Sequence, residues 1–125
     1  MRRVTGITLL ALVALAVGVT LAACGAKDIA NPTTNIDMAR DQAAKSQIML
    51  VKTGIAAYTA TNGTAPPMAT QEVLGTFVDP WPKNPWTEAP MVVGKTKGDL
   101  VYAPGAGTAY TIGVVLSDGS VYNAP

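Results

Sequence analysis

The stretch Ala44-Lys45-Ser46-Gln47-Ile48-Met49-Leu50-Val51-Lys52-Thr53-Gly54-Ile55-Ala56-Ala57-Tyr58 decides the fold of this chain of 125 residues. Apolar side chains recur in it at intervals of 4, 3, 4 and 3 residues, at Ala44, Ile48, Val51, Ile55 and Tyr58. This spacing places them on one face of an α-helix. We therefore predict an amphipathic helix that buries one face against another layer of structure.

The predicted helix runs from about Ile36 to Thr61. Thr34 followed by Asp37 resembles a capping box and predicts the start. Asn62-Gly63 predicts the end, because glycine accepts the left-handed conformation that closes many helices. Gly54 lies inside the helix, where glycine costs about 1 kcal/mol relative to alanine, so we expect a close packing contact there.

The segment after the helix is rich in proline. We expect a short helical turn at Gln71–Leu74, capped by Thr70. The segment 79–86 then holds three prolines and two tryptophans in eight residues, which excludes a helix or a strand interior. It predicts an ordered loop whose two rings, Trp81 and Trp86, pack beneath it. The alternative is a binding loop in which Trp81 and Trp86 form an aromatic platform for a sugar or a peptide.

The C-terminal part is predicted to form β-strands at 91–94, 100–103 and 109–116, followed by a hairpin at Asp118-Gly119 that leads to Val121 and Tyr122. Asp99 and Asp118 occupy turn positions, where aspartate accepts local backbone hydrogen bonds. One helix and a one-faced sheet can bury their apolar sides only against each other. The expected fold class is therefore α+β, with one long helix on a three- to four-stranded antiparallel sheet in a single domain, residues 36–125.

The N-terminus has the pattern of an export signal. Arg2 and Arg3 are followed by the uncharged, largely apolar stretch 4–23. This stretch ends in Leu21-Ala22-Ala23-Cys24, which resembles the lipobox of bacterial lipoproteins. The resemblance implies cleavage between Ala23 and Cys24 and a diacylglycerol on the thiol of Cys24, with no other cofactor. Residues 1–23 would be the signal peptide and 24–35 a tether, so that the domain is anchored in the cell membrane by lipid and faces away from the cytoplasm.

Two other interpretations of the N-terminus stay open. The 20 uncharged residues are long enough to form an uncleaved transmembrane helix with Cys24 buried inside it. The stretch from Gly6 to Ala11 also resembles the start of a type IV prepilin, in which cleavage follows the glycine. Ala11 stands where that family usually has a glutamate.

Composition argues against several classes of function. Histidine is absent, and Cys24 is the single cysteine, so the sequence offers neither the commonest general base nor a zinc site. Without Arg2 and Arg3, seven basic residues stand against eight acidic ones, and no basic patch indicates nucleic acid. We therefore expect no catalytic residue, no metal and no enzymatic activity.

Several motifs together resemble the globular domain of type IV pilin-like proteins, most closely the major pseudopilin of type II secretion systems. The helix exit at 57–63 is similar to the family's Y-x-x-x-N-G pattern. The segment 81–91, Trp-Pro-Lys-Asn-Pro-Trp-Thr-Glu-Ala-Pro-Met, resembles its W-P-x-N-P-(aromatic)-T-G-x-P-M signature, with Glu88 in place of the glycine. Gly98-Asp99-Leu100-Val101-Tyr102 is similar to its strand pattern.

The resemblance implies a helix packed on a sheet, in subunits that stack through N-terminal hydrophobic helices. Cleavage at Cys24 would remove that helix, and 102–110 offers no carboxylate for the calcium-binding loop of many secretion pseudopilins. The expected function is a non-enzymatic surface lipoprotein, structural or accessory to a type II secretion or type IV pilus-like system, with secretion or pilus proteins as partners. The rivals are a pseudopilin subunit cleaved after Gly6 that assembles into a filament, and a ligand- or glycan-binding surface lipoprotein.

Overall fold

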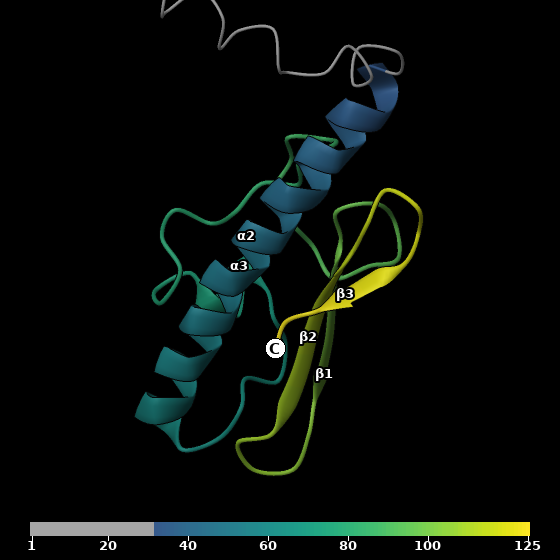
Figure 1. The fold of residues 1–125 in the computed structure, drawn as a ribbon. Coiled ribbons are helices and arrows are strands. Elements are labelled where there is room, and N and C mark those ends of the chain that lie inside the picture. Colours follow the sequence, from purple (N-terminus) through teal and green to yellow (C-terminus); the bar gives the residue numbers. More distant parts are fainter. Residues whose placement is uncertain (1–31) are drawn as a thin grey trace, which may run out of the picture. The chain divides into compact units, whose positions relative to one another are not determined.

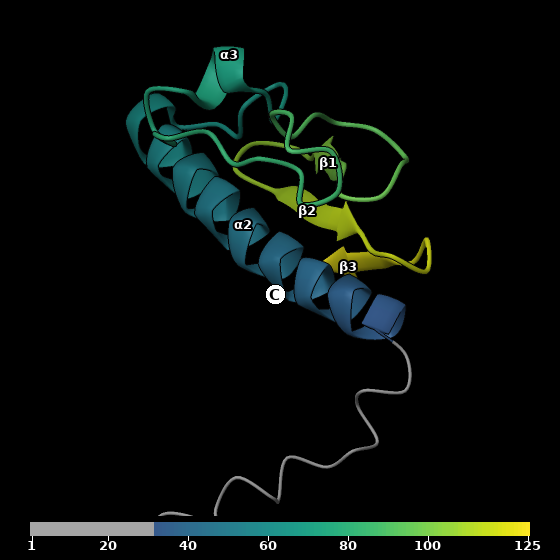
Figure 2. The same cartoon turned by 90° about the horizontal axis from the view of Figure 1, so that it is seen from above.

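The computed structural model describes residues 32–125, which form one long helix and a small sheet (Figure 1). The elements, in chain order, are helices α2 (Pro32–Asn62) and α3 (Gln71–Leu74) and strands β1 (Leu100–Pro104), β2 (Tyr110–Val115) and β3 (Val121–Asn123). Seen from above, α2 lies along one side of the sheet (Figure 2). The α+β class and the predicted packing of a long helix on a sheet of three strands are confirmed.

Helix α2 begins earlier than predicted. Pro32 is its first residue, a position where the missing N–H of proline costs no hydrogen bond. The capping box predicted at Thr34 and Asp37 is wrong, because both residues lie inside the helix, and residues 32–35 of the predicted tether are helical. The predicted end is confirmed: Gly63 has φ +76° and donates its N–H to the Thr59 carbonyl at 2.8 Å.

The sheet is an antiparallel meander in the order β1-β2-β3. Leu100 pairs with Val114, and Val114 in turn pairs with Tyr122. The strand predicted at 91–94 is wrong, because this segment makes only one isolated parallel bridge, between Val93 and Leu100. Parallel pairing needs a long crossover connection, and the short turn from Gly94 to Asp99 is too tight to allow more than that one bridge.

The core lies between α2 and the sheet. On the helix it consists of the predicted stripe Ala44, Ile48, Val51 and Ile55, all 0% exposed. On the sheet it consists of Leu100, Ile112 and Val114, each at most 3% exposed. Burying one large aliphatic side chain stabilises a fold by about 1.5–3 kcal/mol, so this contact is the main source of stability.

Polar contacts fix the helix along the β3 side of the sheet. The Asp41 carboxylate accepts hydrogen bonds from the backbone N–H and the hydroxyl of Ser117, both at 2.8 Å. One turn further along, the Lys45 ammonium lies 5.2 Å from the ring centre of Tyr122. These two contacts join residues far apart in the sequence and set the position of α2 over β3.

The close contact expected at Gly54 is present. Gly54 is buried, and a Cβ atom added to it would overlap Cγ2 of Val78, itself only 6% exposed. We predict that Gly54→Ala lowers the free energy of unfolding by about 1–3 kcal/mol through overpacking, despite the better helix propensity of alanine. Urea unfolding followed by tryptophan fluorescence measures this change. In a Val78→Ala background the same substitution should cost less, and an equal cost in both backgrounds would contradict the packing explanation.

Candidate interaction surfaces

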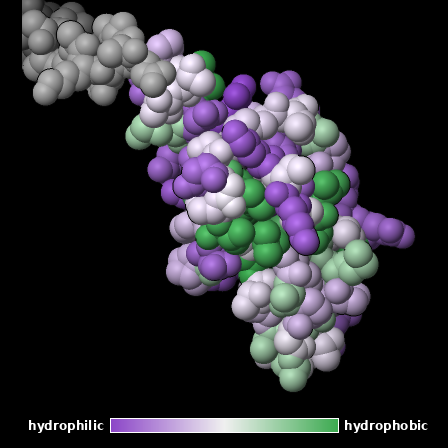
Figure 3. All heavy atoms as spheres, turned by 90° about the vertical axis from the view of Figure 1, so that its right-hand side faces the viewer, coloured by the Kyte–Doolittle hydropathy of each residue, from purple (hydrophilic) through white to green (hydrophobic). Residues whose placement is uncertain are grey.

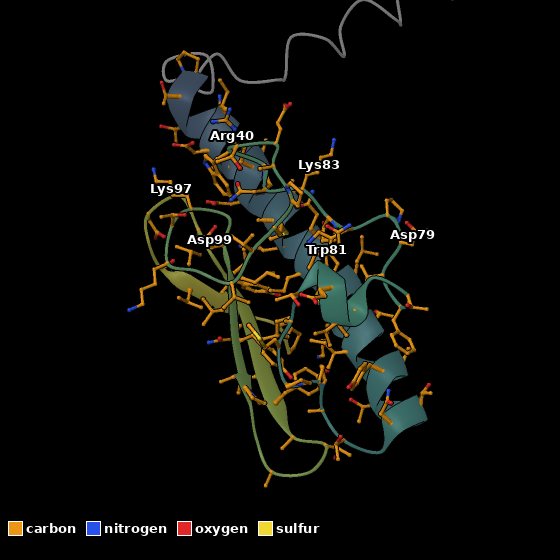
Figure 4. The ribbon with its side chains drawn as sticks, turned by 180° about the vertical axis from the view of Figure 1, so that it is seen from behind. Arg40, Asp79, Trp81, Lys83, Lys97 and Asp99 are labelled. Atoms are coloured by element: carbon orange, nitrogen blue, oxygen red, sulfur yellow. The ribbon has the colours of Figure 1, made fainter. Side chains whose placement is uncertain are left out.

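The proline–tryptophan loop, residues 79–91, is an ordered element that packs on the core. Trp81 is 8% exposed, and its indole N–H donates to the Met91 carbonyl at 3.0 Å. Met91 in return donates its backbone N–H to the Pro82 carbonyl at 2.9 Å. These reciprocal bonds join the two ends of the loop. The prediction of an ordered loop with Trp81 packed beneath it is confirmed (Figure 4).

Trp86, the other residue of the predicted binding loop, is half-buried and packs against the core. Its indole N–H is buried and has no hydrogen-bond partner among the described residues, and the same holds for the side-chain oxygen of Gln47. Because Trp81 is buried and Trp86 is half-buried, the two rings do not together form an exposed aromatic platform.

Asn84 holds the loop to the rest of the domain. Its side chain is 4% exposed; the amide nitrogen donates to the Lys97 carbonyl at 2.8 Å, and the amide oxygen accepts from the Trp86 N–H at 2.9 Å. Gly98 lies so close that an added Cβ would overlap this amide. This role of Asn84 was not predicted from the sequence. The only signal was an asparagine among prolines and aromatic residues.

Glu88 has φ +58°, a left-handed conformation that glycine adopts most easily. Its N–H donates to the Asn84 carbonyl at 2.8 Å, which closes the turn after the second tryptophan. This is the position at which the chain departs from the glycine of the pilin-like signature. The backbone therefore has the conformation that the signature glycine favours.

We predict that Asn84→Ala lowers the free energy of unfolding by about 1–3 kcal/mol, because it removes the two hydrogen bonds that the buried amide makes to the Lys97 carbonyl and the Trp86 N–H. Urea unfolding measures the loss. Thr87→Ala, at an exposed site in the same loop, is the control. Equal stability of the two variants would contradict the role assigned to Asn84.

We predict that Glu88→Gly raises the free energy of unfolding by about 0.5–1 kcal/mol, because glycine relieves the cost of a left-handed residue. Thermal unfolding monitored by circular dichroism checks it. Glu88→Ala removes the same carboxylate but keeps a Cβ, so it should give no gain. If it stabilises as much as glycine does, charge and not backbone conformation is the cause.

Asp99 and Asp118 hold turns, as predicted. Asp99 accepts hydrogen bonds from the backbone N–H of Thr96 at 2.9 Å and from its hydroxyl at 2.6 Å. Asp118 accepts equivalent bonds from Ser120 at 2.9 and 2.6 Å, and these bonds, the hydroxyl first, lower the pKa of the Asp118 carboxyl. Within residues 32–125 no three acidic or cysteine side chains gather in a way that would hold a metal ion.

The outer face of α2 carries no charge. Successive residues of an α-helix lie about 100° apart around its axis. By this angle, the five charged side chains of α2 all lie on the half of the helix that contains the buried stripe, or on the borders of that half. The opposite half exposes Met38 (60%), Met49 (41%) and Leu50 (58%). The hydroxyls of Ser46 and Thr53 on this half donate back to carbonyls of the helix itself. The outer face therefore presents uncharged side chains, in which the apolar Met38, Met49 and Leu50 are mixed with polar ones such as Gln42.

The face of the sheet turned away from α2 is also apolar. Strand alternation places Val101, Val115 and Val121 on it, and Val93 lies beside them in the same groove of about 450 Å³. Val93 and Val121 are 43% and 45% exposed. The space-filling view of this side of the molecule shows a hydrophobic patch at its centre (Figure 3). We call this surface the valine groove.

Comparison with models of protein families, with characterised proteins and with solved structures finds no match for this chain. The lipidation and cleavage sites predicted at Ala23 and Cys24 lie outside the described residues. Within residues 32–125, no helix is both long enough and apolar enough to cross a membrane.

Proposed function

We propose that this chain is an exported lipoprotein, anchored by acyl lipid on Cys24, whose pilin-like domain is a structural or accessory component of a type II secretion or type IV pilus-like assembly. The observation that carries the proposal is the proline–tryptophan loop. Its motif resembles the pilin-like signature, Trp81 and Asn84 hold it on the core, and Glu88, at the position of the signature glycine, has a left-handed conformation that glycine adopts easily.

The arrangement of the domain supports the same family. A single long helix lies on an antiparallel meander of three strands, and α2 ends in the Asn62-Gly63 exit that the resemblance requires. Fold alone does not confer function. The lipobox residues 21–24 supply the second half of the proposal, because acyl chains on a terminal cysteine give stable membrane anchoring.

The surfaces favour a role in protein contacts. The outer face of α2 exposes Met38, Met49 and Leu50 and carries no charge, and the valine groove exposes Val93 and Val121. Apolar patches of this kind mark sites of protein association. Among the described residues, the carboxylates of Asp99 and Asp118 are both engaged in turns, so the proposal assigns them no catalytic role.

The alternative is a pseudopilin subunit, cleaved after Gly6, that assembles into a filament. The uncharged outer face of α2 favours it, since that face suits packing against a neighbouring helix. The glycan-binding alternative gains no support from Trp81, whose ring is buried.

We predict that the chain incorporates radiolabelled palmitate in growing cells and that Cys24→Ala abolishes the label. Cys24 is the only cysteine, so the variant removes every thiol that could carry lipid. Immunoprecipitation and autoradiography measure the label, with equal protein amounts shown by immunoblot. An unlabelled wild-type chain would contradict the lipoprotein proposal and favour cleavage after Gly6.

We further predict that a photo-crosslinking amino acid at Leu50, on the outer face of α2, captures an envelope protein in intact cells. The same amino acid at the exposed loop residue Lys83 is the control and should capture much less. A crosslink from Leu50 only to a second copy of this chain would favour the filament alternative. Absence of any crosslink from Leu50 would contradict a docking role for this face.

A further inference from the structure

A second groove, of about 580 Å³, lies between α2 and the end of the sheet. Lys52 of α2, residues 110–112 of β2 and residues 123–125 line it. Both ribbon views place the C-terminus of the chain beside α2 (Figures 1 and 2). The groove has the volume of a ligand site, and it is separate from the valine groove and from the outer face of α2.

The edge of β2 is open in this groove. β3 pairs only with Gly113–Val115, and beyond it the Ala124 N–H donates to the Ile112 carbonyl at 2.9 Å. Alternate residues of a strand direct their backbone groups to the same edge. The N–H and C=O of Tyr110 therefore face the same side as the Ile112 carbonyl, and no strand within residues 32–125 pairs with them there.

Lys52 supplies the only charged side chain of the groove. It follows Asp41 and Lys45 along the border of α2 that faces β3. Asp41 accepts a hydrogen bond from Ser117, and Lys45 lies over the ring of Tyr122 in β3. Lys52 lies beyond the end of β3, is half-buried, and forms no ion pair with any described carboxylate. Its ammonium is therefore available to a bound anion.

We propose that this groove binds an extended peptide segment of a partner protein that carries a carboxylate opposite Lys52. The segment would continue the sheet beyond β3, with its backbone paired to Tyr110, as in strand addition. The carboxylate would accept a charge-assisted hydrogen bond from the Lys52 ammonium. The half-buried ring of Tyr110 provides apolar contact for a neighbouring side chain of the segment. This assignment does not depend on the lipid anchor.

The test is a titration of the isotope-labelled full chain in detergent micelles, followed by amide NMR shifts. The probe is the capped pentapeptide acetyl-Thr-Val-Glu-Val-Thr-amide, with the glutamine analogue as its matched control. The glutamate peptide should shift the amides of Tyr110, Thr111, Ile112 and Ala124 saturably. Lys52→Gln should weaken binding by about fivefold at low salt, as expected for one exposed ion pair, and Lys83→Gln should leave it unchanged.

Three results would overturn the proposal. The first is no saturable shift of these amides at millimolar glutamate peptide. The second is equal binding of the glutamate and glutamine peptides, which would remove the role of Lys52. The third is reproduction of the shifts by sodium acetate alone at the same concentration, which would reduce the site to one for a small anion. The amide spectrum of free Lys52→Gln shows directly whether the variant is folded.

Discussion

The packing of one face of α2 on one face of a three-stranded sheet is the contact on which the rest of the structure depends. A sheet of three short strands buries too little alone, and a solitary helix has no core at all. The stripe from Ala44 to Ile55 and the inward side chains of β1 and β2 exclude water from each other. Because this single interface uses one face of each element, the opposite faces stay exposed and determine what the domain can contact.

The proline–tryptophan loop closes the part of the core that α2 and the sheet leave open. Trp81 fills space beside the helix, and Asn84 joins the loop to the turn before β1. The backbone N–H of Gly98, which lies in that turn, donates a hydrogen bond to the Val115 carbonyl of β2. The loop is therefore continuous, through hydrogen bonds, with the central strand. The signature at this site reflects structural need, because Trp81, Asn84 and Met91 are buried and hold the loop on the core.

Local patterns in the sequence predicted much of this fold, because they report local physics. The buried stripe of α2, the exit at Gly63, α3 and the three strands follow from periodicity and turn chemistry. The start of α2 at Pro32 was not predicted. Proline at a first helical position and the capping pattern at Thr34 and Asp37 both indicate a helix start, and the capping pattern was the wrong one. The segment 91–94 has strand composition but too short a connection to pair. Asn84, Asp41 and the Lys52 groove depend on contacts across the fold, which no local pattern contains.

The function rests on the N-terminus as much as on the domain, because anchoring at Cys24 and cleavage after Gly6 assign the same fold to different roles. Intact mass spectrometry of the membrane-extracted protein, beside a Cys24→Ser variant, separates them most directly. We expect a mass for residues 24–125 plus acyl chains that is absent in the variant. A mass that starts at Ile7, shifted in the variant only by the substitution itself, would contradict the lipoprotein account and make the chain a pilin-type subunit.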